Sequence, residues 1–144
     1  MSDTKHSLEP VHADEEEEEG VRWPSWLVLF LRTMAAMSLI KGLYHWAVVL
    51  GLDAPKGSGF DAYSTPYQVA TVFFAVIDLV AAVGLWLAAP WGAVVWLTSV
   101  VSMVVVEGLF PQVYGGSLLV ILVELLLLAL YLGLALMAAR EQQT

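Results

Sequence analysis

The sequence predicts an all-α integral membrane protein, a four-helix bundle that follows a disordered acidic N-terminal tail. Hydrophobic residues make up 59% of the 144 residues, well above their share in soluble proteins. Four apolar runs are long enough to cross a bilayer as helices, which takes about 20 residues. They lie at about 25–50, 66–89, 91–110 and 117–139. We therefore expect a tail over 1–22, a transmembrane domain over 23–140 and a short polar end over 141–144.

The composition excludes several classes of protein and site. The chain has no cysteine, which rules out disulfides, thiolate metal sites, iron–sulfur clusters and covalent haem attachment. Its net charge of −8 comes largely from the first nineteen residues, and such an acidic chain is a poor partner for nucleic acid. We expect no metal, no cofactor and no nucleic-acid partner. The first apolar run is too long for a signal peptide and lacks a cleavage pattern, so we expect it to be retained.

The tail carries an unbroken acidic run that repels itself and cannot bury apolar area, so we expect it to be disordered. The run consists of Asp14, Glu15, Glu16, Glu17, Glu18 and Glu19. It could bind a basic cytoplasmic partner, or it could be a solvated tail that keeps its distance from anionic lipid head groups. We favour the second interpretation.

The first span begins at an aromatic entry and carries three basic or imidazole side chains. Trp23 and Trp26 are placed at head-group level, where indoles are enriched. Arg32 lies within two turns of the start, so its long stem can return its charge to the near surface. Lys41 and His45 are i, i+4 neighbours on a face nearly opposite Arg32. The two faces must therefore meet different environments.

The second span has a single ionisable residue, Asp78, near its middle. Helical spacing places it on a face of mostly small side chains, which we expect to point into the bundle because small residues allow close helix packing. That face carries Tyr67, Thr71, Ala75, Ala81, Ala82 and Ala89. A loop over 51–65 precedes this span, and its aromatic end is typical of the far interface.

The second and third spans are joined by so short a connection at Pro90 that they must form an antiparallel hairpin. Trp86 and Trp91 mark its interface. The third span carries Glu107 near its end, and a turn over 111–116 leads to the fourth span, with Glu124 two turns in. Small residues spaced four apart hint at packing in each span. They are Ser38/Gly42, Gly84/Ala88, Thr98/Ser102 and Ala129/Gly133.

Depth along the helices groups the buried charges in one half of the bilayer. The cluster consists of Lys41, His45, Asp78, Glu107 and Glu124. Because a lone charge in lipid costs several kcal/mol, we expect unlike charges at matched depth to pair. Lys41 should pair with Asp78 or Glu124, and His45 should lie near Glu124 or Glu107. Glu107 is close enough to the surface to be merely solvated.

Nothing in the sequence forms a catalytic constellation, and we expect no enzyme. His45 is the one histidine within a span, whereas intramembrane haem usually takes two. The hydroxyl groups of the spans most simply bond to their own helix backbones. These residues are Thr71, Thr98, Ser99 and Ser102.

Basic residues set the expected orientation. Lys5, Arg22 and Arg140 lie near the termini, against Lys56 alone in the outer loops. The positive-inside rule then places both termini in the cytoplasm.

Three segments resemble those of a small alphaproteobacterial family of four-helix inner-membrane proteins, a domain of unknown function. They are LRTMAAMSLIKGLYHWAVVLG, FDAYSTPYQVATVFFAVIDLVAAVGLWLAAPWGAVVWL and FPQVYGG. The resemblance covers about 24–138, and a looser likeness in shape extends to DoxX-like proteins. It implies a four-helix bundle in a bacterial inner membrane and assigns no active residues.

The favoured function is that of a non-enzymatic accessory or regulatory membrane protein. It would act through helix packing with other membrane proteins or as a homo-oligomer. The alternative is a small transporter or proton-conducting element that uses Asp78, Lys41, His45 and Glu124, since intramembrane carboxyl groups beside a histidine are the parts of a proton relay. A third class, an enzyme or a quinone-linked redox accessory, has no specific support in the sequence.

Overall fold

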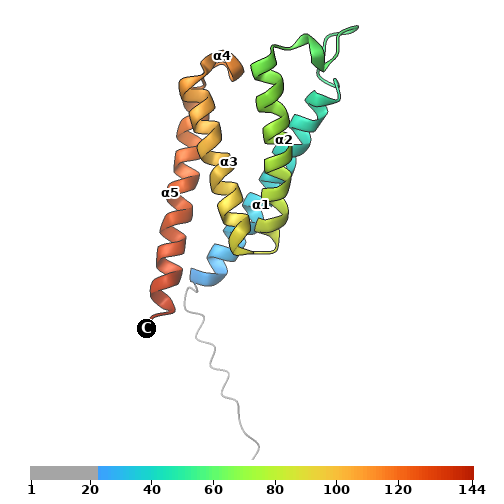
Figure 1. Ribbon diagram of the computed structural model, residues 1–144. Helices are drawn as coiled ribbons and strands as arrows, with labels where there is room; N and C mark the ends of the chain where they lie inside the picture. Colours follow the sequence, from blue (N-terminus) through green and yellow to red (C-terminus); the bar gives the residue numbers. More distant parts are fainter. Residues whose placement is uncertain (1–22) are drawn as a thin grey trace, which may run out of the picture.

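The computed structural model describes residues 23–144, which form one helical bundle (Figure 1). Its elements are α1 (Trp23–Val49), the short 3-10 helix η1 (Phe60–Ala62), α2 (Thr65–Trp86), α3 (Pro90–Leu109), α4 (Pro111–Tyr114) and α5 (Leu118–Glu141). No strand occurs over this described range. The predicted all-α fold class is therefore confirmed.

Four helices are long and apolar enough to cross a membrane, as predicted. They are Pro24–Val49 within α1, then α2, α3 and α5. This is the architecture of a multi-pass membrane protein. The predicted acidic tail, with Asp14 to Glu19, and the side chain of Trp23 lie outside the described residues.

The four long helices pack in cyclic order. The main contacts join α1 to α2, α2 to α3, α3 to α5 and α5 back to α1. The start of α1 and the C-terminus lie at one end of the bundle, and α4 with the 50–64 loop lies at the other (Figure 1). We call these the terminal end and the loop end.

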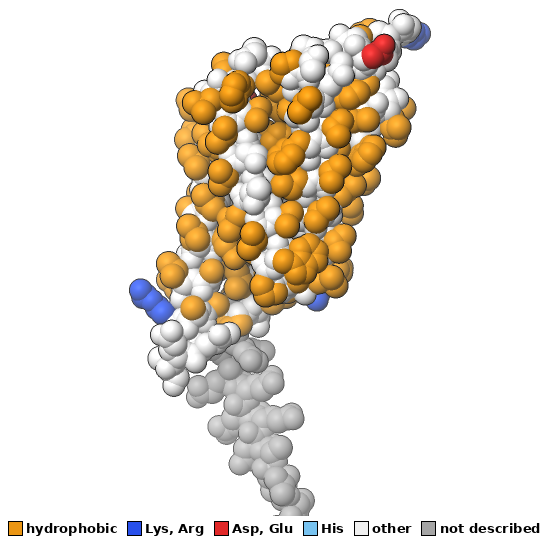
Figure 2. Space-filling view, in the orientation of Figure 1, with side chains coloured by type: hydrophobic (Ala, Val, Ile, Leu, Met, Phe, Trp, Pro, Cys, Tyr) orange, Lys and Arg blue, Asp and Glu red, His pale blue; other side chains and the backbone are white. Residues whose placement is uncertain are grey.

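The outer surface between the two ends is apolar. Figure 2 shows hydrophobic side chains along the whole visible face, with charged atoms only near its ends. Large side chains such as Ile40, Leu126 and Leu136 are more than 60% exposed. An apolar surface of this extent suits lipid, because water would drive it to aggregate.

An aromatic group holds three helices together near the terminal end. Phe30 of α1, Trp96 of α3 and Tyr131 of α5 have ring centroids 5.6 to 6.3 Å apart. The Phe30–Trp96 and Trp96–Tyr131 pairs are edge-on, a geometry that aromatic quadrupoles favour. Phe30 and Trp96 belong to the hydrophobic core cluster, and Tyr131 packs against it.

The α2–α3 hairpin is tight because two glycines face each other. A Cβ added to Gly84 would lie 2.4 Å from the Cα of Gly92, and one added to Gly92 would lie 2.1 Å from the carbonyl carbon of Gly84. No larger residue fits at either position without a shift of the backbone. Of the small-residue pairs in the sequence, Gly84 is thus a true packing position, whereas a Cβ on Gly133 would meet nothing.

Helix α2 ends at Trp86, three residues before the predicted end at 89. Ala88 has a φ of 50°, in the left-handed region. Its N–H donates to the Leu85 carbonyl, and the Ala89 N–H donates to the Gly84 carbonyl. This is the Schellman arrangement that closes helices, with alanine at the position where glycine is usual.

A buried polar network as the candidate functional site

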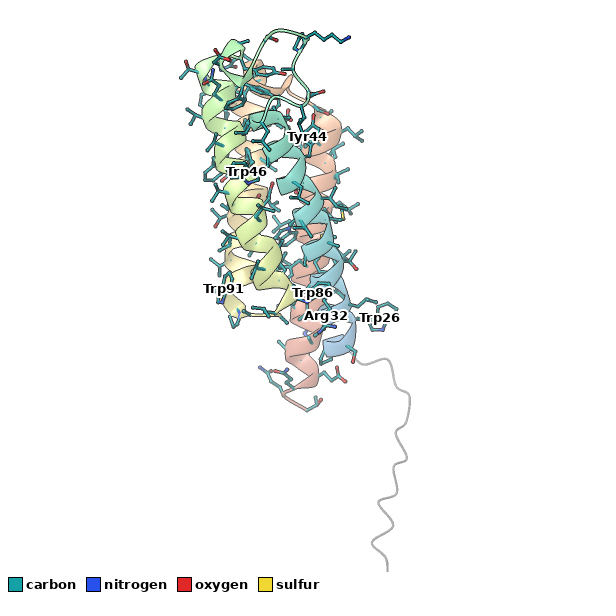
Figure 3. All side chains as sticks on the ribbon, turned by 90° about the vertical axis from the view of Figure 1, so that its right-hand side faces the viewer. Trp26, Arg32, Tyr44, Trp46, Trp86 and Trp91 are labelled. Atoms are coloured by element: carbon teal, nitrogen blue, oxygen red, sulfur yellow. The ribbon has the colours of Figure 1, made fainter. Side chains whose placement is uncertain are left out.

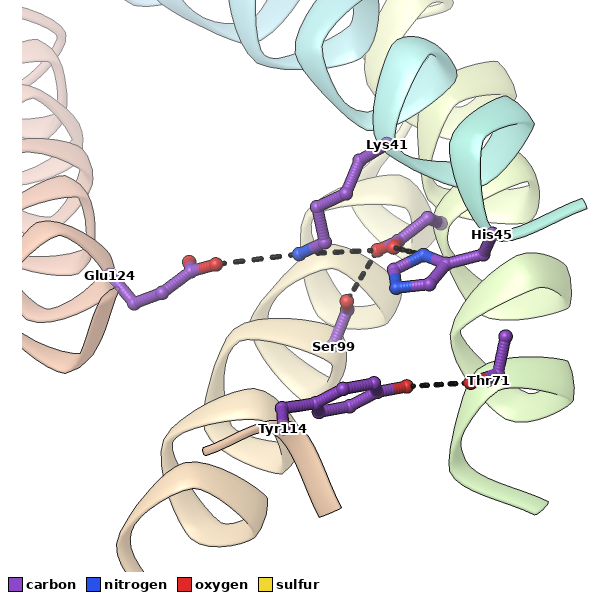
Figure 4. Close-up of polar contacts among 7 residues, drawn as sticks. Lys41, His45, Thr71, Ser99, Tyr114 and Glu124 are labelled. Atoms are coloured by element: carbon purple, nitrogen blue, oxygen red, sulfur yellow. Dashed lines mark hydrogen bonds and ion pairs between the residues drawn. The ribbon is translucent and has the colours of Figure 1, made fainter. Parts of the chain in front are cut away.

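Lys41 links carboxyl groups from two other helices. Its Nζ atom donates a hydrogen bond of 3.3 Å to Glu124 Oε1 on α5 and lies 3.7 Å from Asp78 Oδ1 on α2 (Figure 4). The side chain of Asp78 is 2% exposed and that of Glu124 is 12% exposed. Matched depth predicted one or other contact for Lys41, and both are present.

Asp78 is held by a third helix as well. Ser99 Oγ on α3 donates a hydrogen bond of 2.5 Å to Asp78 Oδ1, and both residues are almost fully buried. Hydrogen bonds to a charged acceptor are among the stronger ones in proteins. Ser99 therefore does not bond to its own helix backbone as expected, because a buried carboxyl group beside it offers a better acceptor.

His45 faces Asp78, so the prediction that it lies near Glu124 or Glu107 is wrong. Its Nδ1 atom is 3.7 Å from Asp78 Oδ2, too long for a hydrogen bond. Both atoms are buried without a hydrogen-bond partner. The imidazole stacks on Phe74, with ring centroids 5.8 Å apart. The prediction failed because it compared only the depths of the side chains along the bundle. It did not consider the direction in which each side chain points around its helix.

Glu107 stands apart from the other charged residues and is not merely solvated. It is buried, and its Oε2 atom accepts a hydrogen bond of 2.8 Å from the Ser117 N–H. Ser117 is the N-cap of α5, and its hydroxyl accepts from the Val120 N–H. A carboxyl group at a helix N-terminus is favoured by unpaired N–H groups and by the helix dipole. Glu107 thus anchors the start of α5.

Tyr114 lies beside the network at the loop end, with its ring centroid 6.3 Å from that of His45. The Tyr114 hydroxyl lies 3.2 Å from Thr71 Oγ1 on α2 (Figure 4). Thr71, like Ser99, thus bonds to a side chain of another helix, whereas a bond to its own helix backbone was expected. Tyr114 sits in α4, a single helical turn within the segment predicted as a plain turn. Burial is the main cause that raises the pKa of Tyr114 to about 12, so its phenol stays neutral at ordinary pH.

Sequence reasoning missed Ser99, Thr71 and Tyr114 as members of the network. The position of Ser99 in the sequence did indicate its partner. Asp78 lies ten residues before Ala88, and Ser99 lies ten residues after Ala89. In a hairpin with so short a turn, these positions reach the same depth. Tyr114 had no comparable signal, because its placement depends on the path of the turn between α3 and α5.

Comparison with known proteins gives one match. The model of a family of unknown function, DUF6163, matches residues 25–142. The chain belongs to DUF6163. No curated protein and no solved structure matches it. The match covers α2, α3 and α5 of this DUF6163 member, α1 from Ser25 onward, and every residue of the polar network.

Three of the four aromatic anchors predicted for this DUF6163 chain lie at one level. Trp26, Trp86 and Trp91 are about half exposed and gather near the terminal end with Arg32 (Figure 3). The guanidinium carbon of Arg32 is 5.5 Å from the centre of the Trp86 ring, a cation–π contact. Arg32 thus points to the near surface, as its position in the first turns predicts.

The residue types of the DUF6163 network can hold helices together and can hold protons. Its members supply one ammonium, one imidazole, two carboxyl groups, two aliphatic hydroxyls and one phenol. Among residues 23–144, no group of three or more acidic or histidine side chains could hold a metal ion.

Proposed function

We propose that the protein is a non-enzymatic, multi-pass protein of the bacterial inner membrane that acts as an accessory or regulatory component. In this function it packs its outer helix faces against membrane-protein partners or another copy of itself. The observation that carries the proposal is that the polar side chains of the long helices point into the bundle and contact one another. Lys41, Asp78, Ser99 and Glu124 come from all four long helices and bond to one another.

Such a network fits a structural clamp. Each long helix contributes one group, so separating α2 from α1, α5 from α1 or α3 from α2 leaves a charge or an acceptor unpaired in lipid. The outer faces are then left apolar and free to pack against other transmembrane helices. A clamp of this kind is consistent with a protein whose function is to hold a shape for a partner.

The location and orientation form part of the proposal. Basic residues near the termini favour a cytoplasmic terminal end, with the Lys56 loop on the outer side. The alphaproteobacterial origin and the DoxX-like shape suggested by the sequence belong to the same proposal. The acidic run from Asp14 to Glu19 is proposed to stay solvated in the cytoplasm, where a basic partner could bind it.

Purification of the full chain from its native membrane in a mild detergent tests the proposal. We expect a membrane protein, or a second copy of the chain, to co-purify in fixed stoichiometry. Deleting Asp14 to Glu19 in a parallel sample separates partners that need the tail from partners that need the helices. A lone monomer that also conducts protons or solutes after reconstitution would overturn the proposal.

A proton-conducting element is the second candidate, and one observation favours it. His45 Nδ1 and Asp78 Oδ2 face each other 3.7 Å apart, buried and without a hydrogen-bond partner, which suits a site that gains and loses a proton. The test is proton flux in liposomes loaded with a pH-sensitive dye. Flux that Asp78→Asn abolishes and Thr98→Ala leaves unchanged would support this function, and absence of flux in the unmodified protein would exclude it.

A further inference from the structure

A lateral cleft opens between α1 and α5 toward the loop end. These helices meet at the Phe30–Tyr131 contact near the terminal end, and farther along they are bridged by Lys41 and Glu124. The cleft has a volume of about 520 Å³, within the range of small-molecule sites. Its lining includes Met37, Ser38, Lys41, Tyr44, Trp96 and Leu127.

Lys41 gives this apolar cleft a hydrogen-bond donor. Its side chain is 31% exposed, whereas Asp78 behind it is 2% exposed. An ammonium has three N–H donors, and one hydrogen bond to Glu124 is formed within the described chain. The hydroxyls of Ser38 and Tyr44 belong to residues of the same lining. A ligand that enters from the lipid side therefore meets Tyr44, which is 57% exposed, and the more deeply placed ammonium of Lys41.

The charge and the membrane depth of the cleft restrict which ligand group could accept a hydrogen bond from Lys41. Two carboxyl groups flank the single ammonium, so an anionic head group would be repelled when both are ionised. Lys41 lies eight residues before Val49, the last residue of α1, which is about 12 Å along the axis. With a hydrocarbon core about 30 Å thick, that position is near the mid-plane. The ester groups of phospholipids stay at the interface and do not reach it.

We propose that the cleft binds the head group of a lipid-soluble quinone. A quinone ring is neutral, carries carbonyl oxygens that accept hydrogen bonds, and moves freely in the hydrocarbon layer. One carbonyl accepts from Lys41 Nζ, and the ring lies beside Trp96 and Tyr44. Its apolar tail leaves the cleft toward lipid past Met37 and Leu127. The proposal concerns binding alone and includes no redox step.

The molecule provides its own matched control. A second lateral cleft, between α2, α3 and α4, has the same volume of about 520 Å³. Its lining is almost wholly apolar and includes Val69, Phe73, Val106, Phe110 and Val113, with no charged group. A molecule that enters clefts only because it is hydrophobic should occupy both clefts. A ligand that needs the ammonium should occupy the Lys41 cleft alone.

Photolabelling of the full chain in phosphatidylcholine vesicles tests the proposal. The probe is a short-chain ubiquinone that carries an azide, with labelled peptides mapped by mass spectrometry. We expect labels around 37–44 and near Leu127, removed by excess decylubiquinone but not by excess decylbenzene. Equal labelling of the Val106–Val113 cleft, or equal competition by decylbenzene, would overturn the proposal and indicate partition into any apolar groove.

Two variants separate binding from folding. Lys41→Met removes the donor and should weaken competition by decylubiquinone about tenfold, the value of one charge-assisted hydrogen bond. Because that change also touches the network, Leu127→Trp serves as a second variant that narrows the cleft and leaves every polar group in place. It should abolish labelling, while Val113→Trp in the control cleft should not. Full labelling of Leu127→Trp would contradict the assignment, as would copies of the chain cross-linked through this cleft.

Discussion

Asp78 and Ser99 stand at equal distances from the α2–α3 turn and form a hydrogen bond of 2.5 Å between the two arms of the hairpin. The bond lies in the same hairpin as the Gly84–Gly92 contact, farther from the turn. Close backbones at the turn and a polar bond deeper in the membrane thus fix the register of the two helices. The network then extends from Asp78 to α1 and α5 through Lys41.

Ser99→Ala should lower the free energy of unfolding by about 2 kcal/mol, because it leaves an oxygen of a buried carboxyl group without its donor. The measurement is an unfolding titration with sodium dodecyl sulfate in mixed micelles. Thr98→Ala is the matched control, since Thr98 is exposed and bonds only to the Val94 carbonyl of its own helix. The two variants should differ clearly, and equal stability would show that the Asp78–Ser99 bond contributes nothing.

Lys41→Met should cost about 3 kcal/mol, because it leaves two carboxyl groups without their cation. Adding Glu124→Gln or Asp78→Asn should recover part of that loss, since each removes one uncompensated charge. A double-mutant cycle in the same titration gives the coupling, which we expect at about 1 kcal/mol for the Lys41–Glu124 pair. Strict additivity would mean that the two side chains do not stabilise each other.

Gly84→Ala should destabilise the hairpin by about 3 kcal/mol, because the new methyl group would overlap the Gly92 backbone. Gly133→Ala is the control, since its methyl group would meet nothing. That variant should be neutral or gain up to about 1 kcal/mol from better helix propensity. A similar loss in both variants would show that glycine is needed for reasons other than the α2–α3 contact.

Ala88→Gly should stabilise the protein by about 1 kcal/mol, because glycine carries no penalty at a left-handed φ of 50°. The side chain of Ala88 is exposed, so no packing is lost. Ala89→Gly provides the comparison, since Ala89 has an ordinary extended backbone with a φ of −77°. That change should alter stability by less than about 0.5 kcal/mol, because the greater freedom of the unfolded chain is offset by the preference for glycine over alanine at the N-cap of α3. A loss at position 88 would contradict the backbone geometry.

Stability should fall between about pH 10 and pH 12 through the Tyr114 phenol. Its pKa is raised from 10.0 to about 12 in the folded protein, so the unfolded state loses this proton first as the pH rises. The contribution is complete below pH 10 and is lost as the pH passes through the folded value. Tyr114→Phe should flatten this part of the stability curve, and its absorbance titration at 295 nm should lack the latest-ionising phenol.

The four spans and their polar depths could be predicted because apolar length and rise per residue depend on local sequence alone. The partners of Lys41 were predicted correctly because depth along the helix was enough: its long side chain reaches carboxyl groups in more than one direction. His45 is shorter, so its partner depends on how α1 is rotated against α2. Glu107 accepts a hydrogen bond from a backbone N–H, and such a bond cannot be predicted from residue types because every residue except proline carries that donor.

Chain order gives the Lys41 bridge a further property. Lys41 and Asp78 both lie in the first two long helices, so chain order lets the ammonium reach a counter-ion before α5 has entered the membrane. The last helix brings Glu124, a second carboxyl group, to the same ammonium. Chain order therefore allows assembly in two steps, an early one in which the Lys41 ammonium is neutralised by α2 and a late one in which α5 docks against that pair.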